Sequence, residues 1–169
     1  DITQSGGTST ADTLTGSASG TATLGQANAI GTLGSFSASG LSLANCGTLT
    51  VAGPVNGGSS TALTTTSGDL VIQGTVSGTQ VTLNSAGAIT EPVGGLISGG
   101  TLVGNAADTA TLGQANAIGT LAGGTAGTGF SLVDTKPLDV TGAVVSSLGT
   151  TSIAVTGAIL TVGANVSGG

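Results

Sequence analysis

The 169-residue sequence lacks histidine, tryptophan, tyrosine and methionine, and it contains a single cysteine and two phenylalanines. Without histidine and with one cysteine, the chain has almost nothing from which to build a zinc site or a Cys–His nucleophile, and no internal disulfide can form. With so few large side chains, a compact globule would bury too little apolar surface to offset chain entropy. We therefore expect neither an enzyme, nor a metal centre, nor a bound cofactor.

Charge is also scarce. Charged residues make up 5% of the chain, and the only cation, Lys136, stands against seven acidic residues, for a net charge of −6. Nucleic acids and anionic membranes are bound by basic surfaces, so the chain is expected to bind neither. No apolar run approaches the ~18 residues of a membrane span. The repeating pattern begins directly at Asp1, so any targeting segment is expected to lie outside this stretch.

Glycine is abundant, with 33 residues, and hydrophobic residues make up 38% of the chain. Disorder usually follows from low hydrophobicity with high charge, which is the opposite composition. The chain therefore favours an ordered fold of short strands and tight glycine turns. A flexible Gly/Ser linker is the alternative interpretation.

One 13-residue phrase, TATLGQANAIGTL, occurs twice, at Thr21–Leu33 and at Thr109–Leu121, 88 positions apart. The similarity extends outward, because GLSLANCGTLTVAGPV (Gly40–Val55) aligns with GFSLVDTKPLDVTGAV (Gly129–Val144). We interpret the chain as two tandem units, residues 1–88 and 89–169, of one continuous array that is a segment of a longer one.

A shorter motif, apolar-x-apolar-x-Gly-x-apolar, recurs inside the units. Apolar residues two or four positions apart lie on one face of a strand, and a glycine on that face indicates a bend without room for a side chain. A period of two excludes a helix. We expect the motif residues to face inward: Leu49, Val51, Gly53 and Val55; Leu70, Ile72, Gly74 and Val76; Leu138, Val140, Gly142 and Val144; Ile153, Val155, Gly157 and Ile159.

The motifs at Leu49 and Leu70 are 21 residues apart, within the 18–22 residues that we take as one solenoid turn. The sequence therefore predicts an all-β parallel β-helix (β-solenoid) of about eight or nine coils, four or five in each unit. Its order would come from stacked apolar ladders and not from an aromatic core. Pro54, Pro92 and Pro137 are expected at corners or loops, and Phe36 and Phe130 inside wider coils.

Three phrases, VTLNSAGAIT (Val81–Thr90), GDLVIQGTVSG (Gly68–Gly78) and the Gly40–Val55 stretch, resemble repeats of filamentous-haemagglutinin-type adhesins, which leave bacteria by two-partner or autotransporter secretion. The resemblance covers nearly the whole chain. It implies a right-handed parallel β-helix, an extracellular location at the bacterial cell surface, and a role in adhesion or fibre building. Host or cell-surface ligands would be bound by other regions.

Several local features suggest other functions. Asp134, Lys136 and Asp139 resemble the clustered charges of polysaccharide-cleaving β-helices, but we interpret this stretch as a surface loop. Cys46 aligns with Thr135 of the second unit and is expected at a turn. Thr-x-Thr pairs have the spacing of outward pairs on a strand, as in ice-binding solenoids, but they recur irregularly. These pairs are Thr8/Thr10, Thr13/Thr15, Thr21/Thr23, Thr48/Thr50 and Thr64/Thr66.

The sequence thus favours a structural role: a rigid, protease-resistant shaft or fibre-forming segment of a secreted bacterial surface protein. No polar capping coil is evident at either end, so we expect stacking on neighbouring repeats or on copies of the chain. The alternative is an ice- or surface-binding solenoid that uses the outward Thr-x-Thr pairs.

Overall fold

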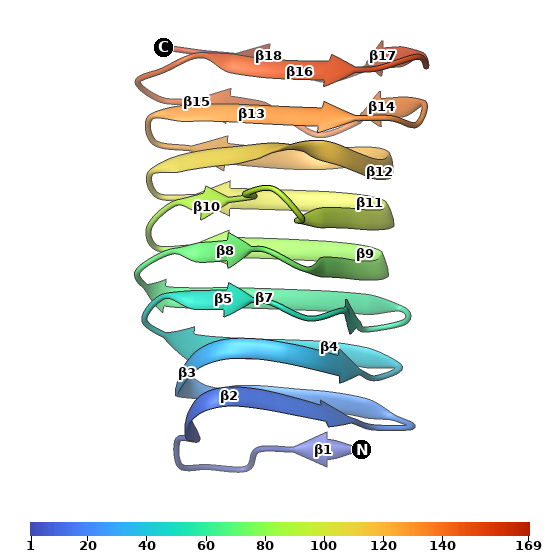
Figure 1. Cartoon of the computed structure of the whole chain (residues 1–169). Coiled ribbons are helices and arrows are strands. Elements are labelled where there is room, and N and C mark those ends of the chain that lie inside the picture. The colour runs from blue at the N-terminus through green and yellow to red at the C-terminus, as the bar shows by residue number, and fades with distance from the viewer.

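A computed structural model describes all residues from Asp1 to Gly169 as one coil of parallel strands without any helix (Figure 1). None of its elements is therefore a helix that could cross a membrane. The strands are β1 (Ile2–Thr3), β2 (Thr10–Ser17), β3 (Thr21–Ser37), β4 (Gly40–Cys46), β5 (Leu49–Val51), β6 (Val55–Asn56), β7 (Ser60–Ser67), β8 (Leu70–Ile72), β9 (Thr75–Ser85), β10 (Ile89–Thr90), β11 (Leu96–Ala106), β12 (Thr109–Ala126), β13 (Gly129–Asp134), β14 (Leu138–Val140), β15 (Val144–Ser146), β16 (Thr151–Val155), β17 (Leu160–Val162) and β18 (Val166–Ser167).

The coil completes eight turns. In Figure 1 the near strands run left to right while the chain climbs, and the far strands run back, so the coil is right-handed. The structure confirms the predicted parallel β-helix, and paired residues on successive coils lie 17–22 positions apart. One column of paired residues runs through Ile2, Ala22, Leu41, Thr61, Val81, Leu102, Leu121, Val140 and Val162.

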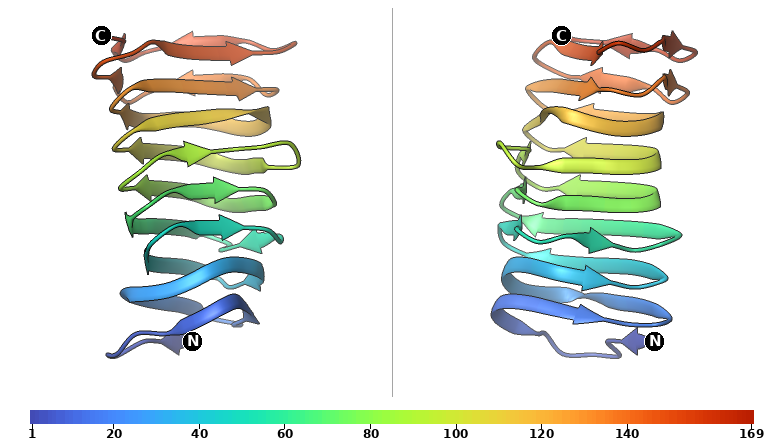
Figure 2. Two further views of the ribbon diagram at one scale, coloured as in Figure 1. Left: turned by 60° about the vertical axis from the view of Figure 1, so that its left-hand side comes forward. Right: turned by 45° about the vertical axis from the view of Figure 1, so that its right-hand side comes forward.

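Each coil has two long sides (Figure 2). Side A carries β1, β4, β7, β14 and β17, and side B carries β2, β5, β8, β10, β13 and β16. The longer strands β3, β9, β11 and β12 turn a corner and link these stacks. Because every coil is paired with the next, the backbone makes 113 hydrogen bonds to itself. This pairing satisfies the backbone without a thick globular core.

The two units have the same pairing pattern, but equivalent residues of the two units lie on opposite sides of the solenoid. Ile2 pairs with Ala22 on side A, and its equivalent Ile89 pairs with Ala110 on side B. Four coils separate Ile2 from Val81, and Ile89 follows about half a coil later. Each unit therefore advances the solenoid by about four and a half coils, and the identical 13-residue phrases lie half a turn apart.

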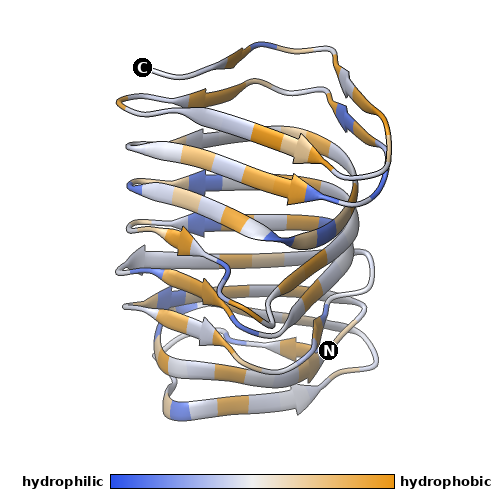
Figure 3. Cartoon of the chain, turned by 45° about the horizontal axis from the view of Figure 1, so that its top comes forward, coloured by the Kyte–Doolittle hydropathy of each residue, from blue (hydrophilic) through white to orange (hydrophobic).

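The interior is one apolar cluster of 29 buried residues. Figure 3 shows apolar and polar positions alternating along the strands. The glycines of the first three motifs approach a neighbouring coil: a Cβ at Gly53 would lie 2.5 Å from the nitrogen of Ser35, and a Cβ at Gly142 would overlap the carbonyl oxygen of Ala122. The apolar residues of these motifs are all fully buried: Leu49, Val51, Val55, Leu70, Ile72, Val76, Leu138, Val140 and Val144.

The fourth motif does not match this arrangement. Ile153 and Val155 lie on side B, paired with β13, while Gly157 adopts a turn conformation with φ of 73° and Ile159 is 72% exposed. The coil stacked on Leu138–Val144 is instead formed by Leu160, Val162 and Val166. The inward prediction for Ile153–Ile159 is therefore wrong for Gly157 and Ile159, because its 15-residue spacing from Leu138 is too short for a full turn.

The prolines and phenylalanines lie where they were expected. Pro54, Pro92 and Pro137 fall between strands, so they interrupt no ladder. Phe36 and Phe130 are 4% and 1% exposed. The two rings fill corresponding parts of the interior, although they come from different positions in the repeat. The second-unit counterpart of Phe36 is Gly124, where a Cβ would lie 2.5 Å from the ring of Phe130.

Candidate functional site

The most regular outer feature is a column of small hydroxyl side chains on side B, which we call the hydroxyl column. Its members are spaced by one coil, and none is buried. The sequence patterns missed it because successive members are 18–21 residues apart and do not all belong to Thr-x-Thr pairs. The paired positions are Thr13, Thr32, Thr50, Val71, Thr90, Thr111, Ser131 and Ser152, with one valine among seven hydroxyls.

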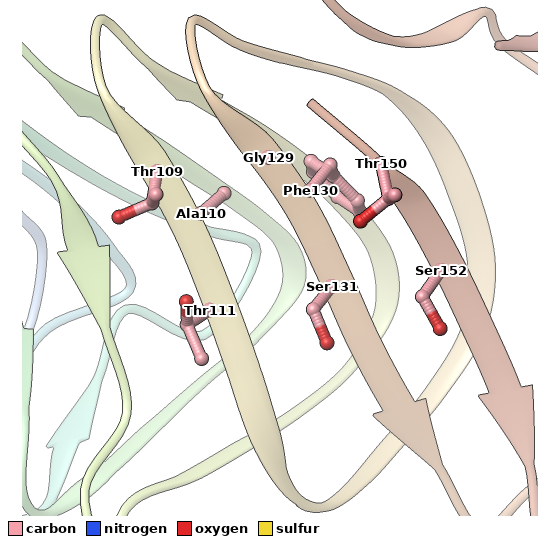
Figure 4. Close-up of a pocket in the computed structure, with 8 residues that line it drawn as sticks. All are labelled: Thr109, Ala110, Thr111, Gly129, Phe130, Ser131, Thr150 and Ser152. Carbon is pink, nitrogen blue, oxygen red and sulfur yellow. The ribbon is translucent and has the colours of Figure 1, made fainter. Parts of the chain in front are cut away.

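A shallow hollow of about 270 Å³ lies beside this column (Figure 4). It forms where Gly129, which has no side chain, is stacked between Thr109 and Thr150. Hydroxyls of Thr111, Ser131 and Ser152 also border it. These uncharged groups can exchange hydrogen bonds with water or a neutral polar surface, but they include no acid, base or metal ligand of useful strength.

The predicted Thr-x-Thr pairs do not form one face. Thr13/Thr15 and Thr48/Thr50 belong to side B, whereas Thr21/Thr23 belongs to side A. The units are related by half a turn, so equivalent pairs are divided between opposite sides. The single-residue hydroxyl column extends over eight coils and is interrupted once, by Val71.

The charged stretch Asp134–Asp139 is not a simple surface loop. Asp134 is fully buried, and its carboxylate accepts hydrogen bonds from the backbone nitrogens of Ile118 (2.9 Å) and Lys136 (2.7 Å). Lys136 and Asp139 are exposed. The expectation of a surface loop is therefore wrong for Asp134, which stabilises a corner, and the three charged side chains do not converge on one face.

Each unit contains a buried polar corner. In the first unit, Asn28 Oδ1 accepts from the nitrogen of Ser9, and Asn28 Nδ2 donates to the carbonyl oxygens of Leu24, Gln26 and Ala44. Asn45 in turn accepts from the nitrogen of Ile30 at 2.8 Å. These bonds pair backbone groups at the place where the ladder bends, so an amide side chain substitutes for the missing strand partner.

The second unit repeats this corner with different charges. Asn116 makes the bonds of Asn28: its Oδ1 accepts from the nitrogen of Ile97 (2.7 Å), and its Nδ2 donates to Leu112, Gln114 and Val133. Asp134 replaces Asn45, and Glu91 replaces Gln4. No motif in the sequence indicated these corners, because their members are brought together from separate coils.

Glu91 is only 4% exposed. Burial raises the pKa of Glu91 above its ordinary value of 4.5, and hydrogen bonds from the Gln114 backbone and the Asn116 side chain oppose that rise. No group of three or more His, Cys, Asp or Glu side chains gathers as metal ligands.

Two further exposed features complete the surface. The free thiol of Cys46 is exposed at the end of β4, before a turn in which Gly47 has φ of 119°. The coil of β16–β18 presents Leu160 and Val162, which are 37% and 53% exposed.

Comparison with protein-family models, curated proteins and solved structures found no match to this chain. Its architecture alone defines the class: a parallel β-solenoid with a sparsely charged, hydroxyl-rich exterior.

Proposed function

We propose that this chain is a shaft or fibre-forming segment of a secreted bacterial surface protein, in which it serves as a rigid stalk. The observation that carries the proposal is the uninterrupted pairing of eight coils across the boundary between the units, where β10 pairs with both β8 and β12. Such a ladder can be lengthened by adding repeats without changing its cross-section.

The scarcity of residues that trypsin and chymotrypsin prefer supports an extracellular role. Trypsin cleaves after Lys or Arg, and the only such residue, Lys136, precedes Pro137, which hinders cleavage. The aromatic residues that chymotrypsin prefers, Phe36 and Phe130, are buried. A folded shaft of this kind offers trypsin and chymotrypsin few of the bonds that they prefer.

The partners that we propose are neighbouring repeats or further copies of this chain, stacked end to end. The coil of β16–β18 exposes Leu160 and Val162 at positions that are inward in earlier coils. Unpaired strand edges also remain on this coil, and a further coil would pair them. The apolar positions at the opposite end are Ile2 and Leu14, which are only partly buried.

Replacing Val162 with aspartate is expected to weaken self-association of the purified chain by about tenfold or more, because stacking would bury an unpaired charge. Sedimentation over a range of concentrations measures this. The matched control is Val93→Asp, since Val93 is 91% exposed on a lateral loop and should not be covered by stacking. A wild-type chain that stays monomeric at every concentration, or equal weakening by both variants, would contradict end-to-end stacking.

The second candidate is binding to ice or another ordered surface, and the hydroxyl column favours it. Seven hydroxyls lie on one side at intervals of one coil, which for stacked strands is about 4.8 Å, except where Val71 interrupts the column between Thr50 and Thr90. The measurement is thermal hysteresis of the purified chain. A freezing point depressed below the melting point would favour this function. Equal freezing and melting points would leave the shaft as the only proposed function.

A further inference from the structure

We propose that Glu91 is a pH-sensitive lock at the junction of the two units: it holds the corner as a neutral hydrogen-bond donor and loosens it when it ionises. Glu91 lies immediately after β10, the first strand of the second unit, and before the turn to β11. Its side chain packs against Gly95, where a Cβ would lie 2.6 Å from Glu91 Cγ.

The first unit supplies an internal reference, because Gln4 occupies the equivalent place. Gln4 Oε1 accepts from the nitrogen of Gln26 (3.2 Å) and from Asn28 Nδ2 (3.0 Å). Gln4 Nε2 donates to Asn28 Oδ1 (2.7 Å) and to the carbonyl oxygen of Gly7 (3.0 Å). Both ends of the amide are therefore satisfied.

Glu91 reproduces only the accepting half of this arrangement. Its Oε2 accepts from the nitrogen of Gln114 (2.9 Å) and from Asn116 Nδ2 (2.9 Å), as Gln4 Oε1 does in the first unit. Its Oε1, at the place of the Gln4 amide nitrogen, is buried and has no partner. In the alignment of the two units, Asn116 and Gly95 are the counterparts of Asn28 and Gly7, whose oxygens accept from Gln4 Nε2. We infer that the buried position of Glu91 Oε1 likewise requires a donor.

A protonated carboxyl supplies that donor through an Oε1 hydroxyl, and an ionised one cannot. An ionised Glu91 would place a buried charge among acceptors, whose cost is several times that of an unpaired neutral group. On ionisation the proton passes to solvent, and we expect the carboxylate to leave the corner with the adjoining turn, Pro92–Gly95.

Few charges compete with this effect. The strands packed around Glu91, which are β8, β9, β11 and β12, contain no ionisable residue. On the next coil the residue paired with Asn116 is Asp134, whose carboxylate already accepts two backbone hydrogen bonds. Lys136 is exposed beyond it, and Asp69 and Asp108 lie outside these strands.

The direction of the pH effect follows from the raised pKa of Glu91. The stability that the neutral group contributes is fully present below pH 4.5 and is lost as pH rises through the raised pKa. Acidification from neutral pH toward about pH 5 is therefore expected to tighten the junction.

The test compares the wild type with Glu91→Gln, which restores the amide of the first unit. The Tm of the wild type should fall as pH rises from about 5 to about 8, a range in which ordinary carboxyls are already ionised, and the Tm of Glu91→Gln should stay nearly level. The reciprocal variant Gln4→Glu should introduce a second pH-dependent fall. Equal pH profiles of the wild type and Glu91→Gln would overturn the proposal.

A local measurement separates the lock from general acid stabilisation. The hydrogen-exchange protection factors of the Gly95 and Ile97 amides, which are corrected for the intrinsic rise of exchange with pH, should fall as Glu91 ionises. The protection factor of the Ser9 amide, the first-unit counterpart of Ile97, should not fall. A carbon-13 titration of the Glu91 carboxyl with a midpoint at or below its ordinary value of 4.5 would also overturn the proposal.

Discussion

Replacing Phe130 with alanine is expected to lower the free energy of unfolding by about 3–5 kcal/mol, the usual loss for a buried phenylalanine. The side chain is 1% exposed and fills the coil between Gly104 and Gly124, neither of which can occupy the vacated space. Urea denaturation followed by circular dichroism measures the change. A loss below about 1 kcal/mol would show that the interior collapses around the missing ring.

The repeat itself provides a rescue of this defect. The first unit has Phe36 and Leu41 where the second has Gly124 and Phe130, so the ring enters the same space from another position. Gly124→Phe alone should overpack the coil and cost about 1–3 kcal/mol or more. The double variant Gly124→Phe/Phe130→Leu copies the first unit and should recover most of the stability. A double variant no more stable than Gly124→Phe would contradict the idea that a ring at position 124 can replace the ring of Phe130.

The second large effect is expected from Asn116→Ala. Asn116 is fully buried: its Oδ1 accepts from the nitrogen of Ile97, and the two hydrogens of its Nδ2 are shared among the carbonyl oxygens of Leu112, Gln114 and Val133 and the Glu91 carboxyl group. Each buried group left unpaired costs about 1–3 kcal/mol, so the total loss should reach at least about 3 kcal/mol. Urea denaturation again provides the measurement.

The matched control for this prediction is Asn105→Ala. The Asn105 side chain bonds Asn84 and Thr125 on the outside of the solenoid, where water can replace both partners. Its removal should cost about 1 kcal/mol or less. Equal losses at Asn105 and Asn116 would mean that the polar corners contribute no more than ordinary surface bonds.

Some of the structure was predictable because it depends on local pattern. Alternation such as Leu49-x-Val51 places side chains on one face, and proline cannot donate to a ladder, so strand faces and the loop positions of Pro54, Pro92 and Pro137 followed from the chain. The fourth motif shows the limit of this reasoning. Ile153–Ile159 has the same local pattern, but its column is decided by the number of residues since the previous coil.

The candidate surface was harder to predict for the same reason. The members of the hydroxyl column, such as Thr90 and Thr111, become neighbours only when coils of unequal length are laid over one another. The polar corners join residues from three coils, as Glu91, Asn116 and Asp134 do. Sequence spacing carries no signal for contacts that depend on the sum of several loop lengths.

The sequence by itself determined the strand period, the approximate coil length and the tandem order of the units, because these depend on side-chain alternation and on repetition along the chain. Only the tertiary structure decided that identical phrases lie on opposite sides and that Asp134 and Glu91 are buried. The physical reason is coil length: the four coils from Ile2 to Val81 take about 20 residues each, so a unit of about 88 residues covers about four and a half coils, and each unit begins half a turn from the last.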